Sequence, residues 1–303
     1  MTKTEAISQR YRGLDIWADE EILEALWEGQ ARAIAAVRPA MPAIAGAARA
    51  IAQRLGVDGR IIYAGAGSSG GLAALDGMEL GPTFGWPNER VVLIVAGGEA
   101  LKPGAHGNAE DDAAEAERRM AALKPGAADV LIVVAASGST RFSLAAVEAA
   151  RRAGSLTVGL ANNPGAPLLS LVDYPILLDS GAEVISGSTR MNAGTAQKAA
   201  LNLLSTLAMI RLGHVYDGLM VNLRVENAKL HERAVGMLTD ITGCRREAAA
   251  HSLEQCGGHV KSAALVLNGA APAEASHLLA QAGGDLRRAL IKLAARGGRS
   301  GIS

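Results

Sequence analysis

The chain has 303 residues, and 49% of them are hydrophobic, which is enough to bury a large core. Lys and Arg together number 30, and so do Asp and Glu, so net charge gives no argument for binding to nucleic acid or to an anionic membrane. Cys244 and Cys256 form no CxxC pair and have no neighbouring His cluster, so we expect reduced thiols in a cytoplasmic protein. The first residues contain no apolar segment typical of a secretion signal, and no apolar run is long enough to span a bilayer.

Residues 1–59 have a helical pattern, with an acidic first turn at Asp19 and an Ala-rich stretch from Ala31 to Leu55. From residue 60 the pattern alternates between strands and helices. The first three strands are continuous apolar runs, as expected for strands covered on both faces. We expect strands at 61–64, 91–96, 130–135, 156–160 and 174–178, and helices at 72–79, 110–123 and 143–153. This alternation predicts an α/β fold with a doubly wound, five-stranded parallel sheet of the flavodoxin-like type at 60–213.

The remainder of the chain is predicted to be helical. A long apolar helix follows Gly194 and ends at Gly213, and a second helical stretch covers 219–238. We therefore expect a connecting helix within 214–241. Short helices punctuated by glycines predict a small helical domain at 242–303.

Two Gly/Ser loops follow strands of the predicted sheet. The first, at 65–70, reads G-A-G-S-S-G and matches the dinucleotide pattern G-x-G-x-x-G, in which Glu99 would be the ribose acid. The second loop, at 136–140, reads A-S-G-S-T. Backbone N–H groups at a helix N-terminus bind anions, and paired hydroxyl-rich loops suit one sugar phosphate better than a pyrophosphate. The candidate phosphate ligands are Ser68, Ser69, Ser137, Ser139 and Thr140.

These motifs resemble those of a known family. V-A-A-S-G-S-T is similar to the signature of sugar isomerase (SIS) domains. The run at 181–198, G-A-E-V-I-S-G-S-T-R-M-N-A-G-T-A-Q-K, resembles the signature of N-acetylmuramic acid 6-phosphate etherases, which are related to the glucokinase regulatory protein. The resemblance covers nearly the whole chain, and it implies that the C-terminal helices form a small UBA-like domain.

The chain departs from the family pattern in both loops. Gly71 stands where the family has Arg after the Ser-Gly of the first loop. In the second loop the family reads S-G-R-T-P, whereas here Ser139 replaces the Arg and Arg141 replaces the Pro. Two basic groups close to the expected phosphate are therefore absent from their usual positions.

The resemblance implies a carbon–oxygen lyase that cleaves the D-lactyl ether at C3 of a hexosamine 6-phosphate. Opening of the sugar ring acidifies the C2 hydrogen, a base removes it, lactate leaves by β-elimination, and water adds at C3. By resemblance Glu79 protonates the departing lactate and Glu110 is the base at C2, so the two acids need opposite protonation states. The apolar neighbours Met78 and Leu80 favour a desolvated Glu79.

The same resemblance points to further binding residues and to a homodimer with a shared site. Arg190 and Lys198 lie in the most specific run and are candidates for substrate or subunit contacts. Glu183, in the same run, is a candidate for substrate binding or equally for a structural ion pair, and His106 and His231 are weaker candidates. Asp111 and Asp112 are expected to cap a helix, so we predict no metal and no cofactor.

Three other functions are compatible with parts of the sequence. An aldose–ketose isomerase shares ring opening and C2 proton abstraction but releases no lactate. A non-catalytic sugar-phosphate sensor would resemble the glucokinase regulatory protein, although this chain is too short for two SIS domains. A nucleotide-dependent dehydrogenase depends on the G-x-G-x-x-G match alone.

Overall fold

The computed structural model describes residues 2–98 and 108–297. The chain divides into two compact units. The first comprises the residues up to Met78 together with Asn88–Leu207, and the second comprises Glu79–Pro87 and the residues from Ala208 onward.

The first unit contains a five-stranded parallel sheet. Its strands are β1 (Ile61–Gly65), β2 (Val91–Val95), β3 (Val130–Val134), β4 (Leu156–Ala161) and β5 (Tyr174–Leu177). They lie in the order β2-β1-β3-β4-β5, and every neighbouring pair is parallel. The predicted fold class is confirmed, and each strand lies within one residue of its predicted bounds. The continuous apolar runs β1 and β3 are buried along their whole length, as predicted, and so is β4. The third such run, β2, is buried only at Ile94 and Val95, because it lies at the edge of the sheet.

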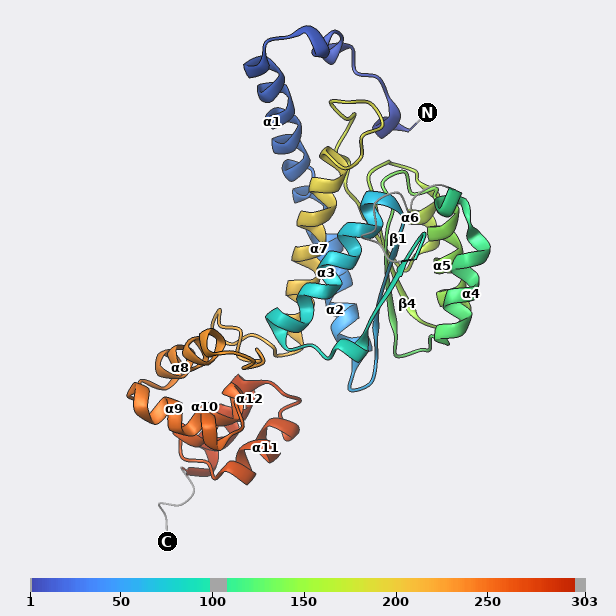
Figure 1. Ribbon diagram of the computed structural model, residues 1–303. Coiled ribbons are helices and arrows are strands. Elements are labelled where there is room, and N and C mark those ends of the chain that lie inside the picture. The colour runs from blue at the N-terminus through green and yellow to red at the C-terminus, as the bar shows by residue number, and fades with distance from the viewer. Residues whose placement is uncertain (1, 99–107, 298–303) are drawn as a thin grey trace. The chain divides into compact units, whose positions relative to one another are not determined.

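Helices cover both faces of this sheet (Figure 1). α4, α5 and α6 lie on one face and α2 and α3 on the other, as a doubly wound topology requires. The helices of this part of the chain are α1 (Asp19–Ala35), α2 (Met41–Leu55), α3 (Gly67–Phe84), α4 (Ala113–Leu123), α5 (Arg141–Arg152), α6 (Pro167–Leu171) and α7 (Asn192–Arg211). Both α3 and α7 begin in the first unit and end in the second.

The predicted helical stretch from Ala31 to Leu55 is in fact interrupted. α1 ends at Ala35, a 3-10 turn follows at Arg38–Ala40, and α2 begins at Met41. Pro39 and Pro42 explain the break, because proline cannot donate a backbone hydrogen bond inside a helix but fits its first turn.

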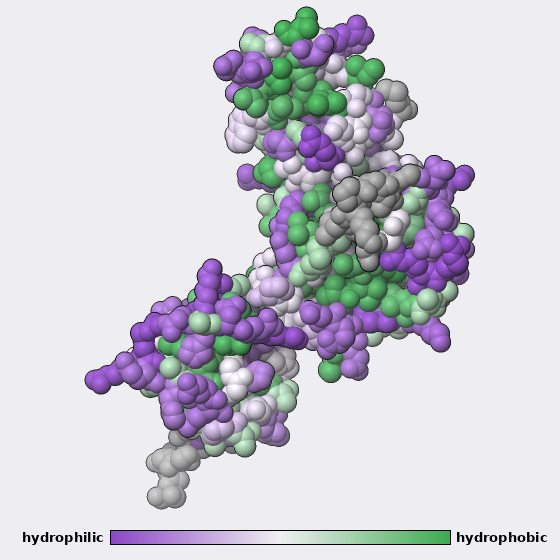
Figure 2. All heavy atoms as spheres, viewed as in Figure 1, coloured by the Kyte–Doolittle hydropathy of each residue, from purple (hydrophilic) through white to green (hydrophobic). Residues whose placement is uncertain are grey.

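α1 carries large apolar side chains at the surface. Leu23 and Trp27 are each 65% exposed and Ile34 is 53% exposed, and their spacing places them along one side of the helix. Figure 2 shows hydrophobic side chains gathered at the surface over this helix. The exposed part of α1 is therefore more apolar than a solvated helix face usually is.

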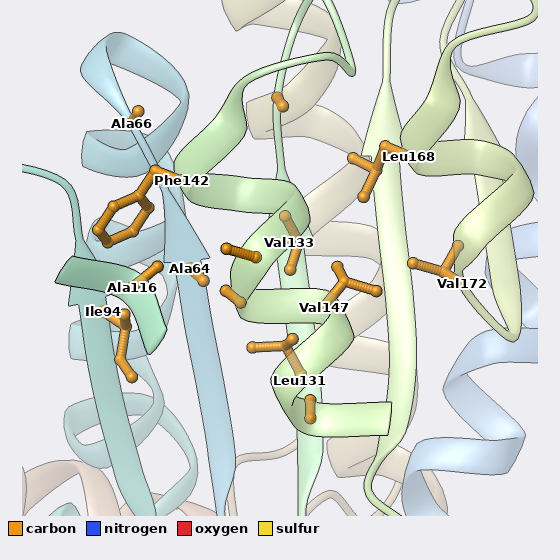
Figure 3. Close-up of a cluster of buried hydrophobic side chains, with 14 of the residues drawn as sticks. Ala64, Ala66, Ile94, Ala116, Leu131, Val133, Phe142, Val147, Leu168 and Val172 are labelled. Carbon is orange, nitrogen blue, oxygen red and sulfur yellow. The ribbon is translucent and has the colours of Figure 1, made fainter. Parts of the chain in front are cut away.

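The core on the α5 side of the sheet is built from interlocking apolar side chains (Figure 3). Leu131 and Val133 of β3 lie beside Val147 of α5, whereas Phe142 of the same helix lies beside Ala64 of β1, and all five are fully buried. Ala residues fill the closest approaches between helix and sheet, consistent with the small number of aromatic residues in the chain.

The second unit is a bundle of short helices: α8 (Ala228–Thr242), α9 (Arg246–Gln255), α10 (Val260–Leu267), α11 (Pro272–Gln281) and α12 (Leu286–Gly297). The prediction that 219–238 is helical was wrong for its first part. Asn227 is the N-cap of α8, its side-chain oxygen accepting a hydrogen bond from the Leu230 amide at 3.0 Å, so the helix begins only after it. Val221 and Leu223 instead pack with the helices in one apolar cluster.

A charged pair joins β1 and β3 at the edge of the sheet where these strands begin. Asp129, which is 5% exposed, accepts hydrogen bonds from the Arg60 guanidinium at 2.7 Å, the Arg60 amide and the Gly126 amide. Burial alone would raise the pKa of Asp129, but these hydrogen bonds outweigh it, and the pKa lies below its ordinary value.

We predict that Asp129→Asn lowers the free energy of unfolding by about 1–3 kcal/mol at pH 7, because it weakens a buried charge-assisted network. A depressed folded-state pKa contributes stability above the unfolded-state value of about 3.9, and this contribution is lost as the pH falls through the folded-state pKa. Urea denaturation of the wild type, D129N and the exposed-site control D58N checks this. We expect the difference in free energy of unfolding between wild type and D129N to become smaller below pH 4. An equal difference at all pH values would contradict a lowered pKa of Asp129 in the folded protein.

Candidate active site

The two hydroxyl-rich loops meet at one edge of the sheet. β1 and β3 are neighbours in the strand order, although β2 lies between them in the sequence. α3 follows β1 and α5 follows β3, and the two helices lie on opposite faces of the sheet (Figure 1). At such a switch point the loops diverge and leave a crevice beyond the carboxyl ends of the strands, where ligands of open α/β sheets bind.

A cavity of about 130 Å³ occupies this position. It brings together four of the five predicted phosphate ligands, Ser68, Ser69, Ser137 and Thr140, with the predicted base Glu110. The other residues lining it are Glu5, Ala66, Gly67, Ala135, Ala136 and Thr189. One cavity thus joins hydroxyl groups and a carboxylate that are far apart in the sequence.

Two helices begin at the cavity. α3 begins at Gly67 and α5 begins directly after Thr140, so the unpaired N–H groups and positive dipole ends of two helices lie at its wall. The Thr140 side chain makes no capping hydrogen bond to its own helix, and its hydroxyl lies 3.5 Å from the Ser137 hydroxyl. Among the described residues that line the cavity, Glu5 and Glu110 are the charged ones.

Glu110 is positioned by its neighbours in the chain. It lies in a 3-10 turn, Asn108–Asp111, in which Ala109 packs against the core cluster. Asp112 then accepts a hydrogen bond from the Glu115 amide at 2.9 Å and caps α4, which confirms the capping predicted for Asp112, whereas Asp111 ends the 3-10 turn. On the cavity side, a Cβ on Gly67 would lie 2.7 Å from the Glu110 Oε1 atom, and Gly67 has a φ of +54°. Only glycine allows the Glu110 carboxylate to approach α3 so closely.

Three further predicted residues line two neighbouring recesses. Ser139 is exposed and lines a recess of about 330 Å³ with Lys3 and Asn163. Arg190 and Lys198 line another, of about 370 Å³, together with exposed Ile34 of α1. Ser139, Arg190 and Lys198 are therefore not among the residues lining the Glu110 cavity of this chain.

Glu183 has a structural position. It is fully buried, and its two carboxylate oxygens accept hydrogen bonds from the Asn192 amide at 2.8 Å and the Ala193 amide at 2.9 Å. These amides form the start of α7, so Glu183 supplies a carboxylate to the positive end of a helix. Burial raises the pKa of Glu183, opposed by these two hydrogen bonds. The geometry supports helix capping better than direct substrate contact.

Glu79 lies in the later part of α3 and is exposed. Leu80 is buried as expected, but Met78 is 44% exposed, so the apolar surroundings predicted for Glu79 do not close around it within one chain. One turn earlier, buried Asp76 accepts hydrogen bonds from Tyr63 at 2.7 Å and from Asn202 at 2.9 Å. Burial raises the pKa of Asp76, against the effect of these bonds. This network fixes α3 against β1 and α7.

The sequence did not single out Glu5 or Thr189 as part of the cavity. Thr189 lies inside the most specific run at 181–198, so position within that run was an available signal. Glu5 lies in an isolated 3-10 turn, Lys3–Glu5, and no local pattern links it to the Gly/Ser loops. Glu99 and His106 lie outside the described residues.

Within residues 2–98 and 108–297, no group of three or more His, Cys, Asp or Glu side chains is arranged to hold a metal ion. Over the same residues, no helix combines the length and the apolar character needed to cross a bilayer.

The fold and loops match known proteins. Residues 43–151 match the model of the glucokinase regulatory protein N-terminal SIS domain. Among solved structures, a phosphoheptose isomerase from Francisella tularensis is similar at 24% identity, covering 64% of this chain and 98% of that one with a TM-score of 0.46.

Curated relatives are similar over most of their length. An N-acetylmuramic acid 6-phosphate etherase from Deinococcus radiodurans is 50% identical over 88% of this chain and 87% of its own length. The enzyme of the same name from Rubrobacter xylanophilus is 42% identical over 90% and 91%. Another, from Halalkalibacterium halodurans, is 38% identical over 96% and 98%.

We predict that Gly67→Ala reduces the affinity of the cavity for a hexosamine 6-phosphate by about tenfold or more. The new methyl group would lie 2.7 Å from the Glu110 Oε1 atom, and a non-glycine residue strains the positive φ at position 67, so the first turn of α3 and the Glu110 carboxylate must shift at the cavity wall. Gly71→Ala is the matched control on the same helix, because a Cβ there meets no atom within 4 Å. Isothermal titration calorimetry compares the two variants, and equal affinities for both would contradict the described cavity.

Proposed function

The chain belongs to the N-acetylmuramic acid 6-phosphate etherase family, and we propose that it cleaves the D-lactyl ether of N-acetylmuramic acid 6-phosphate to N-acetylglucosamine 6-phosphate and D-lactate. The observation that carries this proposal is the cavity that joins Glu110 to the two hydroxyl-rich loops. A carboxylate beside an anion cradle suits proton abstraction from a phosphorylated sugar.

The phosphate is held by hydroxyl and amide groups. Ser68 and Ser69 at the start of α3, with Ser137 and Thr140 before α5, surround the cavity from two sides. The positive ends of both helices favour the dianion. Holding the phosphate here fixes the distance between the sugar carbons and the Glu110 carboxylate, and such positioning is itself a large part of catalysis.

Glu110 acts on the open-chain sugar. With the C1 aldehyde exposed, the C2 hydrogen is acidic, and the Glu110 carboxylate accepts it as a proton. The electron pair left at C2 forms a C2–C3 double bond, and the C3–O bond to lactate breaks. The departing oxygen takes a proton from a general acid, and water then adds across the double bond, returning hydrogen to C2 and placing a hydroxyl group on C3. Each positioned proton transfer contributes typically ~10²–10⁴-fold to the rate.

We assign the general acid to Glu79, and we propose that a second copy of the chain supplies it. Ten residues of α3 separate Ser69, at the cavity, from Glu79, and ten residues of α-helix rise about 15 Å. A glutamate side chain does not bridge that length. The partner's copy of α3 is then the source of the acid for each cavity.

The surface around these residues supports a homodimer. Leu75 and Met78 of α3 are 37% and 44% exposed, and Leu203 of α7 is 43% exposed. Lys198 of α7 and Arg190, which precedes that helix, line a recess outside the Glu110 cavity. Burying these apolar side chains against a second copy would also exclude water around Glu79, as a proton donor to an alkoxide needs.

The proposal includes a cytoplasmic location. Cys244 and Cys256 are both free and partly buried, as thiols of a reducing compartment are.

We predict that Glu110→Gln abolishes both C2 exchange and lactate release, whereas Glu79→Gln keeps C2 exchange and loses lactate release by ~10²–10⁴-fold. The measurement is incubation with N-acetylmuramic acid 6-phosphate in D₂O, with enzymatic assay of D-lactate and NMR detection of deuterium at C2. The two variants differ because Glu110 removes the proton from C2, whereas Glu79 protonates the oxygen that leaves C3.

Glu117→Gln is the control, because Glu117 lies on the exposed side of α4. A wild-type protein that releases no lactate overturns the etherase assignment. Deuterium at C2 without lactate in the wild type would instead support an isomerase. Full lactate release by E79Q would remove Glu79 from the mechanism.

A further inference from the structure

The proposed elimination needs a proton transfer that neither assigned acid performs. The sugar binds predominantly as a closed ring, and the C2 hydrogen becomes acidic only when the C1–O5 bond has broken. Ring opening moves a proton from the C1 hydroxyl to O5. Glu110 must be ionised for the C2 step and Glu79 must hold its proton for the C3 step, and a third group that opens the ring leaves both of them in these states.

The cavity that contains Glu110 has a second carboxylate, that of Glu5. Glu5 comes from the N-terminal 3-10 turn Lys3–Glu5, more than a hundred residues from Glu110 in the sequence. Ser and Thr hydroxyls are the other ionisable or exchangeable side-chain groups that line the cavity within the described residues. At neutral pH a carboxylate is a far better proton acceptor than a hydroxyl group.

The N-terminal segment is fixed over the cavity by buried hydrogen bonds. Thr4 is fully buried, and its hydroxyl accepts a hydrogen bond from the Asn163 amide group at 3.0 Å, while its own backbone N–H donates to Asn163 Oδ1 at 3.3 Å. The Gly187 amide donates to the Thr4 carbonyl at 3.2 Å, and the Ser186 hydroxyl donates to the Glu5 carbonyl at 2.9 Å. These contacts hold residues 4 and 5 between two loops of the first unit.

The Glu5 carboxylate has a defined position, but other side chains do not bind it within the described part of the chain. A Cβ on Gly187 would lie 3.0 Å from Glu5 Oε2, and Gly187 has a φ of +75°, so glycine at 187 leaves room for the carboxylate. Within the described part of the chain, the Glu5 carboxylate takes part in no hydrogen bond or ion pair with another side chain. The Glu110 carboxylate likewise lies where a Cβ on Gly67 would contact it. The cavity therefore has two carboxylates, each accommodated by a glycine.

We propose that Glu5 is a catalytic residue that opens the sugar ring, an inference that rests on the proposed etherase function. The ionised carboxylate accepts the proton of the C1 hydroxyl, and the O1 electron pair forms the C1=O1 bond. The C1–O5 bond breaks with its electron pair on O5. Glu5 then donates the same proton to O5 and returns to its ionised state. No oxidant, reductant or other reactant is consumed.

The direct test is exchange between the α and β anomers of N-acetylglucosamine 6-phosphate, followed by NMR. Anomers interconvert only through the open chain, so the enzyme-catalysed exchange rate measures ring opening without any need for elimination. We expect Glu5→Gln to lower this rate by ~10²–10⁴-fold. Glu110→Gln keeps anomer exchange and loses deuterium incorporation at C2. Glu5→Asp, which retains the acid on a shorter side chain, recovers part of the lost exchange.

Matched variants separate the possible outcomes. Glu20→Gln, on the exposed first turn of α1, is expected to leave anomer exchange unchanged. Thermal melting of E5Q close to that of the wild type excludes unfolding as the cause of its loss. Wild-type rates of anomer exchange in E5Q overturn the proposal. So does an E5Q protein that loses lactate release but keeps anomer and C2 exchange, because Glu5 would then be the acid for lactate. Absence of lactate from the wild type refutes the etherase function, while anomer exchange still reports on Glu5.

Discussion

The arrangement of the site depends on one topological constraint: the strand order changes direction at β1, with β2 on one side of it and β3 on the other. Because β3 returns beside β1 on the side opposite β2, the helices that follow β1 and β3 leave on different faces of the sheet. Their N-termini remain at the same edge, where unpaired amides and Ser/Thr hydroxyls face a common cavity. The apolar strands and the alanine-rich contacts behind them support this edge, so two loops about seventy residues apart line one cavity, the place that we propose for the phosphate.

The charges are distributed unusually for a phosphate site. The cavity itself is lined by two acids and by no basic side chain among the described residues, so helix dipoles and neutral donors must balance the phosphate. Arg190 and Lys198, which the sequence linked to substrate, lie in a recess on the helical side that also carries exposed apolar residues. Asp76 ties α3 to α7 through Asn202 and Ser205. The exposed residues that we expect at the dimer interface, Leu75 and Met78 of α3 and Leu203 of α7, therefore lie on two helices that Asp76 links.

The sequence predicted the sheet and the cavity loops well because both depend on local patterns. Continuous Val/Ile runs define buried strands, and Ser68 and Ser137 follow them directly. The sequence failed where the controlling contacts are distant or where local chemistry overrides propensity. Pro39 interrupts the first helical stretch, and Asn227 delays the start of α8. Nothing near Glu5 in the sequence indicates that Asn163 and Gly187 would hold its segment at the cavity, because those contacts span more than 150 residues.

The central claim is that each cavity with its Glu110 is completed by Glu79 of a second copy, and mixing of two inactive variants tests it most directly. E79Q and E110Q chains are unfolded together, refolded as a mixture and assayed for lactate release. If the site is shared, each mixed dimer contains one site with both acids intact, and the mixture recovers about a quarter of wild-type activity. If both acids of a site come from the same chain, every site in the mixture lacks one of them. Activity no greater than that of the separate variants would therefore contradict the account.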